Sequence, residues 1–333
     1  MQAIRERTGL KPADLGDDIL TATEPLVLRG LVRDWPAVQA GLQSPEALAG
    51  YLLGHWRDAT VGVMLAPPEA GGRLFYNDDF TGFNFERKVG RFDVVLGSLM
   101  QLLGAPQPPA LYIGATSVDT CLPGFRAEND LGLAVDDPIV SLWLGNRSRI
   151  SAHFDLPDNV ACVVAGRRRF TLFPPEQIDN LYVGPLDFTP AGQAVSLVDF
   201  HAPDFDRHPR FREALAHGQE AELEPGDALF IPSMWWHHVE ALSALNLLVN
   251  YWWRRTPDYM DSPINALMLA LLTMRGLPPE QRRSWRHLFD HYIFDDGDRA
   301  VAHIPAHARH ALAPLDDAGA RAMRAHLLNR LKR

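Results

Sequence analysis

The chain has 333 residues, of which 47% are hydrophobic and 22% are charged, a composition typical of globular proteins that excludes wholesale disorder. Its length predicts one large domain with an appendage, or two domains. With 32 Lys and Arg against 41 Asp and Glu, the formal charge is −9, which argues against a chain-wide surface for nucleic acid or anionic membranes.

The cysteines and the N-terminus bear on the cellular location. Cys121 and Cys162 are the only cysteines, so the sequence contains neither a disulfide framework nor a zinc site built from cysteines. Residues 1–15 lack the apolar stretch of a signal peptide, and no apolar run reaches the ~18 residues that a membrane span needs. We therefore expect a soluble, cytoplasmic protein without a membrane segment.

Residues 1–110 predict an α/β segment that packs on the domain that follows. Two short apolar runs, at residues 26–28 and 60–64, are typical of strands. Ser44 and Pro45 are typical of a helix start, with a capping residue followed by proline in the first turn. Apolar residues then recur at helical spacing over residues 92–103, which predicts a second helix.

Residues 111–258 predict a β domain, because six short segments rich in β-branched and aromatic residues are bounded by Gly, Pro or Asp. These segments are residues 112–114, 139–144, 160–164, 168–173, 228–231 and 247–252. Short strands separated by turns indicate an antiparallel sandwich or barrel. Residues 199–209 are rich in Asp, His and Pro and predict a loop across one mouth of that barrel.

Residues 259–333 predict a helical segment. Residues 261–263 (Asp-Ser-Pro) are typical of a helix start, and residues 264–274 are almost wholly apolar. Further helices are predicted from Pro279 and from Asp317 onwards. A helix that is apolar all round must be buried, so residues 264–274 are expected to pack either on the barrel or on a second subunit.

The residues with the clearest chemical meaning are His153 and Asp155. They are two positions apart, so on a strand both side chains project to one face and can supply two ligands to a divalent metal. A third ligand is expected from the pair His237 and His238, which follows a Pro-Gly-Asp turn and a strand. Two histidines and one carboxylate on one side of an ion are typical of non-haem Fe(II) oxygenases. The competing reading is a chance H-x-D beside a core histidine, and the strand-borne pattern favours the metal.

Longer motifs carry a family resemblance. The segments LYIGAT, SAHFDLPDNVACVVAGRRRFTLFPP, EPGDALFIPSMWWHHVEAL and LLVNYWW occur in this order, and LVLRGLVRDWPA precedes them. In these motifs the chain resembles the JmjC/cupin-like 2-oxoglutarate-dependent oxygenases, especially the branch that contains the asparaginyl hydroxylase acting on hypoxia-inducible factor. The resemblance covers roughly residues 20–254. It implies a mainly β fold with flanking helices, a double-stranded β-helix (jelly-roll) core, and a C-terminal helical segment that pairs two subunits.

The resemblance also implies the roles of individual residues. The iron ligands would be His153, Asp155 and His237, with His238 in support. The residues near 2-oxoglutarate would be Tyr112, Asn159, Arg168, Asn250 and Trp252, with Arg168 where relatives place a lysine that pairs with the distal carboxylate. Relatives carry threonine three residues before the first iron ligand, where this chain has Ile150. Ser151, one place away, is the residue expected to replace that threonine.

The activity implied by the resemblance is hydroxylation of a C–H bond on a protein side chain or another substrate, coupled to conversion of 2-oxoglutarate to succinate and CO₂. The charge of −9 disfavours RNA as substrate and favours a neutral or basic polypeptide. One alternative is a metal-dependent cupin enzyme that acts on a small molecule without 2-oxoglutarate. A second is a non-catalytic binding module. Arg168 and Tyr112 favour the oxygenase over the first alternative, because chemistry without 2-oxoglutarate needs no carboxylate clamp.

Overall fold

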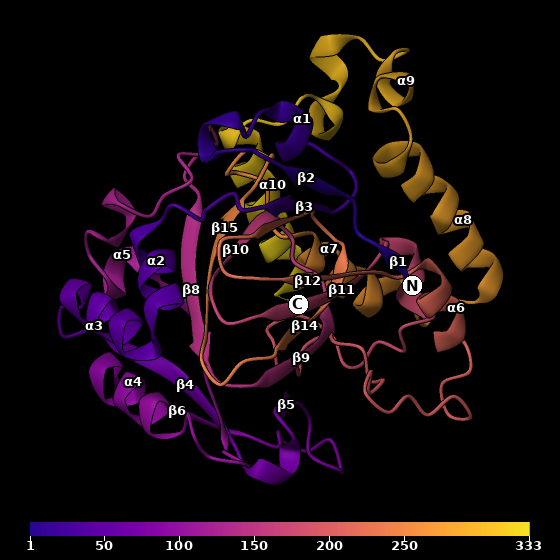
Figure 1. Cartoon of the computed structure of the whole chain (residues 1–333). Helices are drawn as coiled ribbons and strands as arrows, with labels where there is room; N and C mark the ends of the chain where they lie inside the picture. Colours follow the sequence, from indigo (N-terminus) through magenta and orange to yellow (C-terminus); the bar gives the residue numbers. More distant parts are fainter. Residues whose placement is uncertain (333) are drawn as a thin grey trace. The chain divides into compact units, whose positions relative to one another are not determined.

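The structure is a computed structural model that describes residues 1–332, and it divides into two compact units, Met1–Arg255 and Thr256–Arg333 (Figure 1). The first unit contains two β-sheets and the second is helical. The predicted divisions after residues 110 and 258 stay predictions. Among the described helices, none is long and apolar enough to span a membrane.

Of the eight strands β8–β15, four belong to each sheet, and the chain passes repeatedly from one sheet to the other. The larger sheet has the spatial order β2 (Glu6–Thr8), β3 (Leu26–Arg29), β13 (Ala228–Ile231), β10 (Asp158–Ala165), β15 (Asn246–Trp253), β8 (Ile139–Gly145), β7 (Ala110–Ser117), β4 (Thr60–Ala66) and β6 (Glu86–Arg91). The smaller sheet has the order β1 (Gln2–Ala3), β12 (Gln219–Leu223), β11 (Arg168–Phe173), β14 (Trp236–Ala241), β9 (Ser148–His153) and β5 (Arg73–Leu74). Pairing within β8–β15 is antiparallel throughout. The predicted mainly β fold of the double-stranded β-helix type is confirmed.

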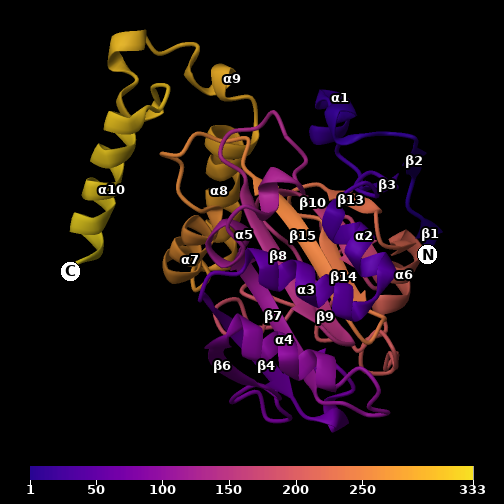
Figure 2. The ribbon, with the colours of Figure 1, turned by 60° about the vertical axis from the view of Figure 1, so that its left-hand side comes forward.

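Helices cover the outer face of the larger sheet. The helices of the first unit are α1 (Asp17–Leu20), α2 (Pro36–Gln43), α3 (Pro45–His55), α4 (Phe92–Gln101), α5 (Val118–Cys121) and α6 (Phe211–His217), with short 3₁₀ turns at η1 (Pro12–Asp14), η2 (Pro68–Ala70), η3 (Phe125–Ala127) and η4 (Pro175–Asp179). Of these, α6 packs on β11 and β14 of the smaller sheet. Figure 2 shows α2, α3 and α4 beside this sheet, and their apolar side chains share one core with Val160, Cys162 and Val249 of its strands. Because the facing sheet covers the other side, all eight residues of β10 are buried. This explains why β10 reads as an almost continuous apolar run.

A second core lies on the inner faces of the two sheets. It contains Ala161 and Val163 of β10, Phe170 and Leu172 of β11, and Ile231 of β13. Ala161, Phe170 and Ile231 also form part of the wall of a cavity that contains the candidate site. The closely packed inner core therefore gives the cavity a rigid base.

Most elements predicted from the sequence are present. The strand at 26–28 is β3, the helix after Ser44 is α3, and the Ser44 hydroxyl accepts a hydrogen bond from the Ala47 N–H at 3.1 Å. Residues 199–209 form a loop. The loop residues that line the cavity, however, are 190–193, upstream of that segment. Pro190 and Gly192 are typical of a turn, but nothing in residues 190–193 indicates that this turn reaches the cavity.

The second unit consists of α7 (Pro263–Met274), α8 (Pro279–Phe289), the π-helical turn η5 (Asp290–Phe294), α9 (Gly297–Val301), the 3₁₀ turns η6 (Ala306–Ala308) and η7 (His310–Leu312), and α10 (Asp317–Leu331). The Tyr259 hydroxyl donates to the Leu315 carbonyl at 2.6 Å, and Arg324 lies 3.8 Å from Asp261. These contacts tie the start of the unit to its last helix. No residue of α7 is fully buried, although the helix is almost entirely apolar.

Candidate metal centre

Three predicted ligands converge inside the first unit. His153 is the last residue of β9, Asp155 lies two positions later in the turn, and His237 lies on β14 directly opposite His153 in the ladder. One ligand atom from each side chain lies within 4.8 Å of the others, and the imidazole rings of the two histidines are 4.3 Å apart between centroids. No other group of this kind occurs in the part of the chain that the structure describes.

Backbone carbonyls orient both imidazoles. Nδ1 of His153 lies 2.9 Å from the Ser151 carbonyl, and Nδ1 of His237 lies 3.0 Å from the Trp235 carbonyl. A carbonyl can only accept a hydrogen bond, so each Nδ1 carries the proton and each Nε2 presents a lone pair. This is the arrangement by which proteins prepare histidine for a metal. It favours His237 over His238 as the third ligand.

Asp155 is fixed by two further contacts. The indole N–H of Trp252 donates to its Oδ2 at 3.2 Å, and its backbone carbonyl accepts from the Met234 N–H at 2.9 Å. Its Oδ2 also lies 3.5 Å from Nε2 of His237. The carboxylate therefore faces the imidazoles with one oxygen already oriented.

The pKa values of His153 and Asp155 favour ligation. Burial, reinforced by the nearby His237, lowers the pKa of His153 to about 4, so its imidazole is neutral near pH 7. Burial raises the pKa of Asp155, but the hydrogen bond and charge of His237 outweigh it, so the net pKa is below the usual range. Burial lowers the pKa of His237, and the contact with Asp155 reverses the direction. Two imidazoles and a carboxylate on one side of an ion fit Fe(II), with positions left open on the other side.

The ligands line a cavity of about 600 Å³, which is large enough for a small cosubstrate and part of a second molecule. Its wall includes eight of the nine predicted site residues: Tyr112, His153, Asp155, Asn159, Arg168, His237, Asn250 and Trp252. They come from β7, β9, β10, β11, β14 and β15 and from the turn after β9. The structure therefore brings together residues up to 140 positions apart in the sequence (Tyr112 to Trp252).

Arg168 is a buried cation on the wall of this cavity. Its residue is 2% exposed, its guanidinium interacts with the Tyr112 hydroxyl, and one Nη donates to the Trp143 carbonyl at 3.4 Å. Its Nε has no hydrogen-bond partner, and burial lowers its pKa. A buried guanidinium without a carboxylate is costly, so the geometry calls for an anion in the cavity. Arg167 and Arg169 instead pair with Glu222 outside it, as strand alternation predicts.

A row of polar side chains connects three strands. The Trp143 indole N–H donates to the Asn250 amide oxygen at 2.7 Å, and the Asn250 amide donates to the Asn159 side chain at 3.2 Å. Trp143 was missed by the sequence analysis. It lies within the segment 139–144, which was predicted as a strand of the β domain, and only its indole N–H among apolar neighbours could have marked it.

Ser151 is the one predicted site residue that does not line the cavity, whose wall contains Ile150 instead. The pairing of β9 with β14 runs from His153↔His237 to Ile150↔Val239, so β9 has one extra residue here. This β-bulge reverses the alternation and turns Ile150, rather than Ser151, to the same face as His153. The expected hydroxyl contribution of Ser151 to the cosubstrate clamp is therefore not supported by the geometry.

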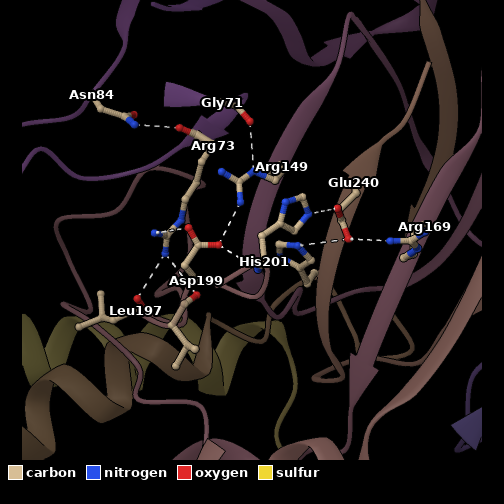
Figure 3. A network of polar contacts seen from close by, with 11 residues as sticks. Gly71, Arg73, Asn84, Arg149, Arg169, Leu197, Asp199, His201 and Glu240 are labelled. Carbon is tan, nitrogen blue, oxygen red and sulfur yellow. Dashed lines mark hydrogen bonds and ion pairs between the residues drawn. The ribbon is translucent and has the colours of Figure 1, made fainter. Parts of the chain in front are cut away.

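The opposite face of β9 and β14 carries a network of charged groups (Figure 3). Asp199 lies 3.0 Å from Arg149 and 3.5 Å from Arg73, while Glu240 contacts His201 and lies 3.8 Å from Arg169. These contacts connect the loop around residues 197–201 to β5, β9, β11 and β14. The network stiffens the two strands that carry the histidine ligands from the side that does not face the cavity.

Comparison with known proteins gives the family. The model of the cupin-like domain family matches residues 12–259, which include all the motifs of the resemblance. The chain is 34% identical over 158 residues to lysine-specific demethylase JMJ31 of Arabidopsis thaliana (45% of this chain, 28% of the relative). It is 29% identical over 241 residues to lysine-specific demethylase 8 of Xenopus tropicalis (71% and 49%). It is 31% identical over 163 residues to mouse tRNA wybutosine-synthesizing protein 5 (44% and 46%). The chain spans half or less of the length of these curated relatives.

Proposed function

This chain belongs to the cupin-like domain family, and we propose that it is an Fe(II)- and 2-oxoglutarate-dependent oxygenase that hydroxylates a C–H bond. The observation that carries the proposal is one cavity that contains both a His-Asp-His ligand set and a buried arginine without a carboxylate partner. A cupin enzyme that works without 2-oxoglutarate needs the ligand set but not the arginine. A binding module needs neither, so the combination favours the oxygenase.

The proposed roles follow the positions of the side chains. His153, Asp155 and His237 hold the metal, and Arg168 with Tyr112 binds the distal carboxylate of 2-oxoglutarate through a charge-assisted hydrogen bond. When bound, iron and 2-oxoglutarate supply the oxidising chemistry, in which dioxygen provides the hydroxyl oxygen while the keto acid becomes succinate and CO₂. Asn159, Asn250 and Trp252 form the side wall and orient the cosubstrate; the Asn250–Asn159 hydrogen bond and the hydrogen bond from Trp252 to Asp155 keep them fixed.

The test separates binding from turnover. Calorimetry with Mn(II), which does not support turnover, should show 2-oxoglutarate binding that requires the metal and Arg168. In air with Fe(II), the protein should release succinate, and candidate peptides should increase the rate. Metal-dependent binding without any succinate release would favour the binding module, and metal binding without affinity for 2-oxoglutarate would favour the other cupin chemistry.

For the substrate we propose a side chain of a polypeptide. The relatives differ in the substrates that their names state, lysine residues in some and a tRNA in another, so the comparison leaves the choice open. The formal charge of −9 supports a polypeptide over RNA, since a polyanion would be repelled over most of the surface. A cytoplasmic location is part of the same proposal, and cell fractionation would test it.

We also propose that the second unit forms a homodimer. Several large apolar side chains of α7 and α10 are exposed within this unit: Leu267, Met268, Leu272, Met323, Leu327, Leu328 and Leu331. Exposed apolar surface on neighbouring helix turns is typical of a surface that a second copy covers. The double variant Leu267→Glu, Leu271→Glu should be monomeric by light scattering. A wild-type protein that scatters as a monomer near 37.2 kDa at micromolar concentration would contradict the proposal.

A further inference from the structure

Arg87 is a second arginine on the cavity wall, at the other end of a row of side chains that begins at Tyr112. It lies on the edge strand β6 opposite Met64 of β4, and Met64 lies opposite Tyr112 of β7. All three residues line the cavity. Two steps between neighbouring strands separate the backbones of Arg87 and Tyr112 by about 10 Å. The arginine is therefore well separated from the residue that contacts Arg168.

The guanidinium of Arg87 is held without a carboxylate. It lies 5.2 Å from the ring centroid of Phe83 and 5.6 Å from that of Phe85, and one Nη donates to the Pro190 carbonyl at 3.2 Å. Its acidic neighbour Glu86 pairs with Lys88 at 2.7 Å, and within residues 1–332 no carboxylate pairs with Arg87. Aromatic rings and one carbonyl orient a cation but do not neutralise it, so its remaining N–H groups are available.

The charges that line the cavity do not balance once the proposed cofactors are present. Asp155 is the single acidic side chain among the described residues of the wall. A divalent metal and the two arginines contribute four positive charges, and Asp155 with dianionic 2-oxoglutarate removes three. One positive charge remains, and it lies on Arg87 at the end of the cavity away from Arg168. Arg87 is solvent-exposed, so this charge is screened and not buried, and a ligand that carries one negative charge would pair with it.

We propose that the substrate carries a carboxylate that binds Arg87 while its reacting C–H bond lies nearer the metal. This inference rests on the proposed function and names the substrate class of the same site. The single residual charge and the planar fork of arginine, which binds a carboxylate with two parallel hydrogen bonds, favour a carboxylate over a phosphate. The preference is local. The chain as a whole has a charge of −9, but the cavity selects an acidic group.

The experiment observes Arg87 directly by NMR. The protein is labelled with ¹⁵N-arginine and loaded with 2-oxoglutarate and with Zn(II), a diamagnetic metal that leaves the NMR signals sharp. It is then titrated with acetate, with acetamide, the neutral isostere of acetate, and with inorganic phosphate. Arg87→Lys identifies the Nε–H resonance of Arg87. Acetate should shift this resonance saturably, while acetamide should not, and phosphate should need at least a tenfold higher concentration.

The matched control is Arg91 on the same strand, whose guanidinium lies 4.8 Å from the Trp56 ring but pairs with Asp93 and Asp58 and does not line the cavity. Its Nε–H resonance should not respond to acetate.

A second pair of probes separates the sources of the carboxylate. An N-acetylated, C-amidated Ala-Asp-Ala peptide that shifts Arg87 at lower concentration than free aspartate indicates a polypeptide, and the reverse indicates a small molecule.

Two results would overturn the inference: no saturable shift of Arg87 with acetate, or saturation by phosphate at a lower concentration than by acetate. Failure of the proposed function is distinguishable, because it appears as absence of 2-oxoglutarate binding by the metal-loaded wild-type protein before any acetate is added. If 2-oxoglutarate binds and acetate does not reach Arg87, only the substrate class is wrong.

Discussion

His237 and His238 are adjacent in the sequence, and β14 places them in opposite surroundings. His237 faces the cavity with Nδ1 bonded to a carbonyl and Nε2 directed toward Asp155. His238 faces the charged network, where neither ring nitrogen forms a hydrogen bond and Nε2 lies 3.9 Å from Glu240. Burial, with the charges of His201, Arg149 and Arg73, lowers the pKa of His238 to about 3. The comparison teaches that strand alternation, and not residue type, decides which imidazole can bind a metal.

The largest effect that would test this comparison is loss of the metal. His237→Ala should abolish Mn(II) binding by calorimetry, because two ligands on one side do not hold the ion, and His153→Ala and Asp155→Ala should do the same. His238→Ala should keep metal binding within a few-fold. All variants should retain the far-ultraviolet circular dichroism of the wild type. Retained binding in His237→Ala with loss in His238→Ala would show that the assignment within the pair is wrong.

Arg168 and Arg169 provide the same comparison on β11. Arg168→Ala should weaken 2-oxoglutarate binding by two or more orders of magnitude, because removing one partner of a buried ion pair costs about 3–5 kcal/mol. Arg169→Ala should leave the affinity within a few-fold, since its charge pairs with Glu222 and Glu240 outside the cavity. Calorimetry with Mn(II)-loaded protein measures both. An unchanged dissociation constant in Arg168→Ala would move the clamp to another residue.

Trp252 and Trp253 extend the comparison to β15, with a smaller effect. Trp252→Phe keeps an aromatic ring but removes the N–H that orients Asp155, so metal affinity should fall about tenfold. Trp253 packs with the apolar core on the other face, and Trp253→Phe should lower the free energy of unfolding without changing metal affinity. Equal metal affinities in the two variants would mean that the indole contact does not position the carboxylate.

The charged network around Asp199 should make the free energy of unfolding depend on pH. Burial raises the pKa of Asp199, but the His201 N–H and the guanidiniums of Arg73 and Arg149 outweigh it and hold the pKa below the usual range. A depressed folded-state pKa stabilises the protein above the unfolded value of about 4, and this stabilisation is lost as pH falls through the folded value. Asp199→Asn should therefore cost roughly 1 kcal/mol at pH 7, discounted for partial exposure. In urea titrations the cost should shrink as pH falls below about 4 and vanish once the carboxyl is protonated in both states.

Much of the site could be predicted because its residues are encoded in short strands with regular alternation. His153, Asp155, Asn159 and Arg168 all reach the cavity that the alternation implies. Ser151 lies off the cavity wall for a physical reason, since the bulge in β9 arises from pairing with a strand more than 80 positions away, and nothing local in the sequence specifies it. Arg87 was not predicted either. It lies on an exposed edge strand, where a charged residue is the ordinary expectation.

The direct pairing of His153 with His237 also has a consequence for the order of folding. The two ligands are 84 positions apart (237 − 153), and they meet only after the long-range ladder between β9 and β14 has closed. Such non-local pairings form late, because the entropy of closing the intervening loop is lost before the contact forms. A nascent or partly folded chain thus has no assembled metal-binding site. We expect the finished domain to acquire its metal last, and to gain thermal stability in proportion to the logarithm of the metal concentration.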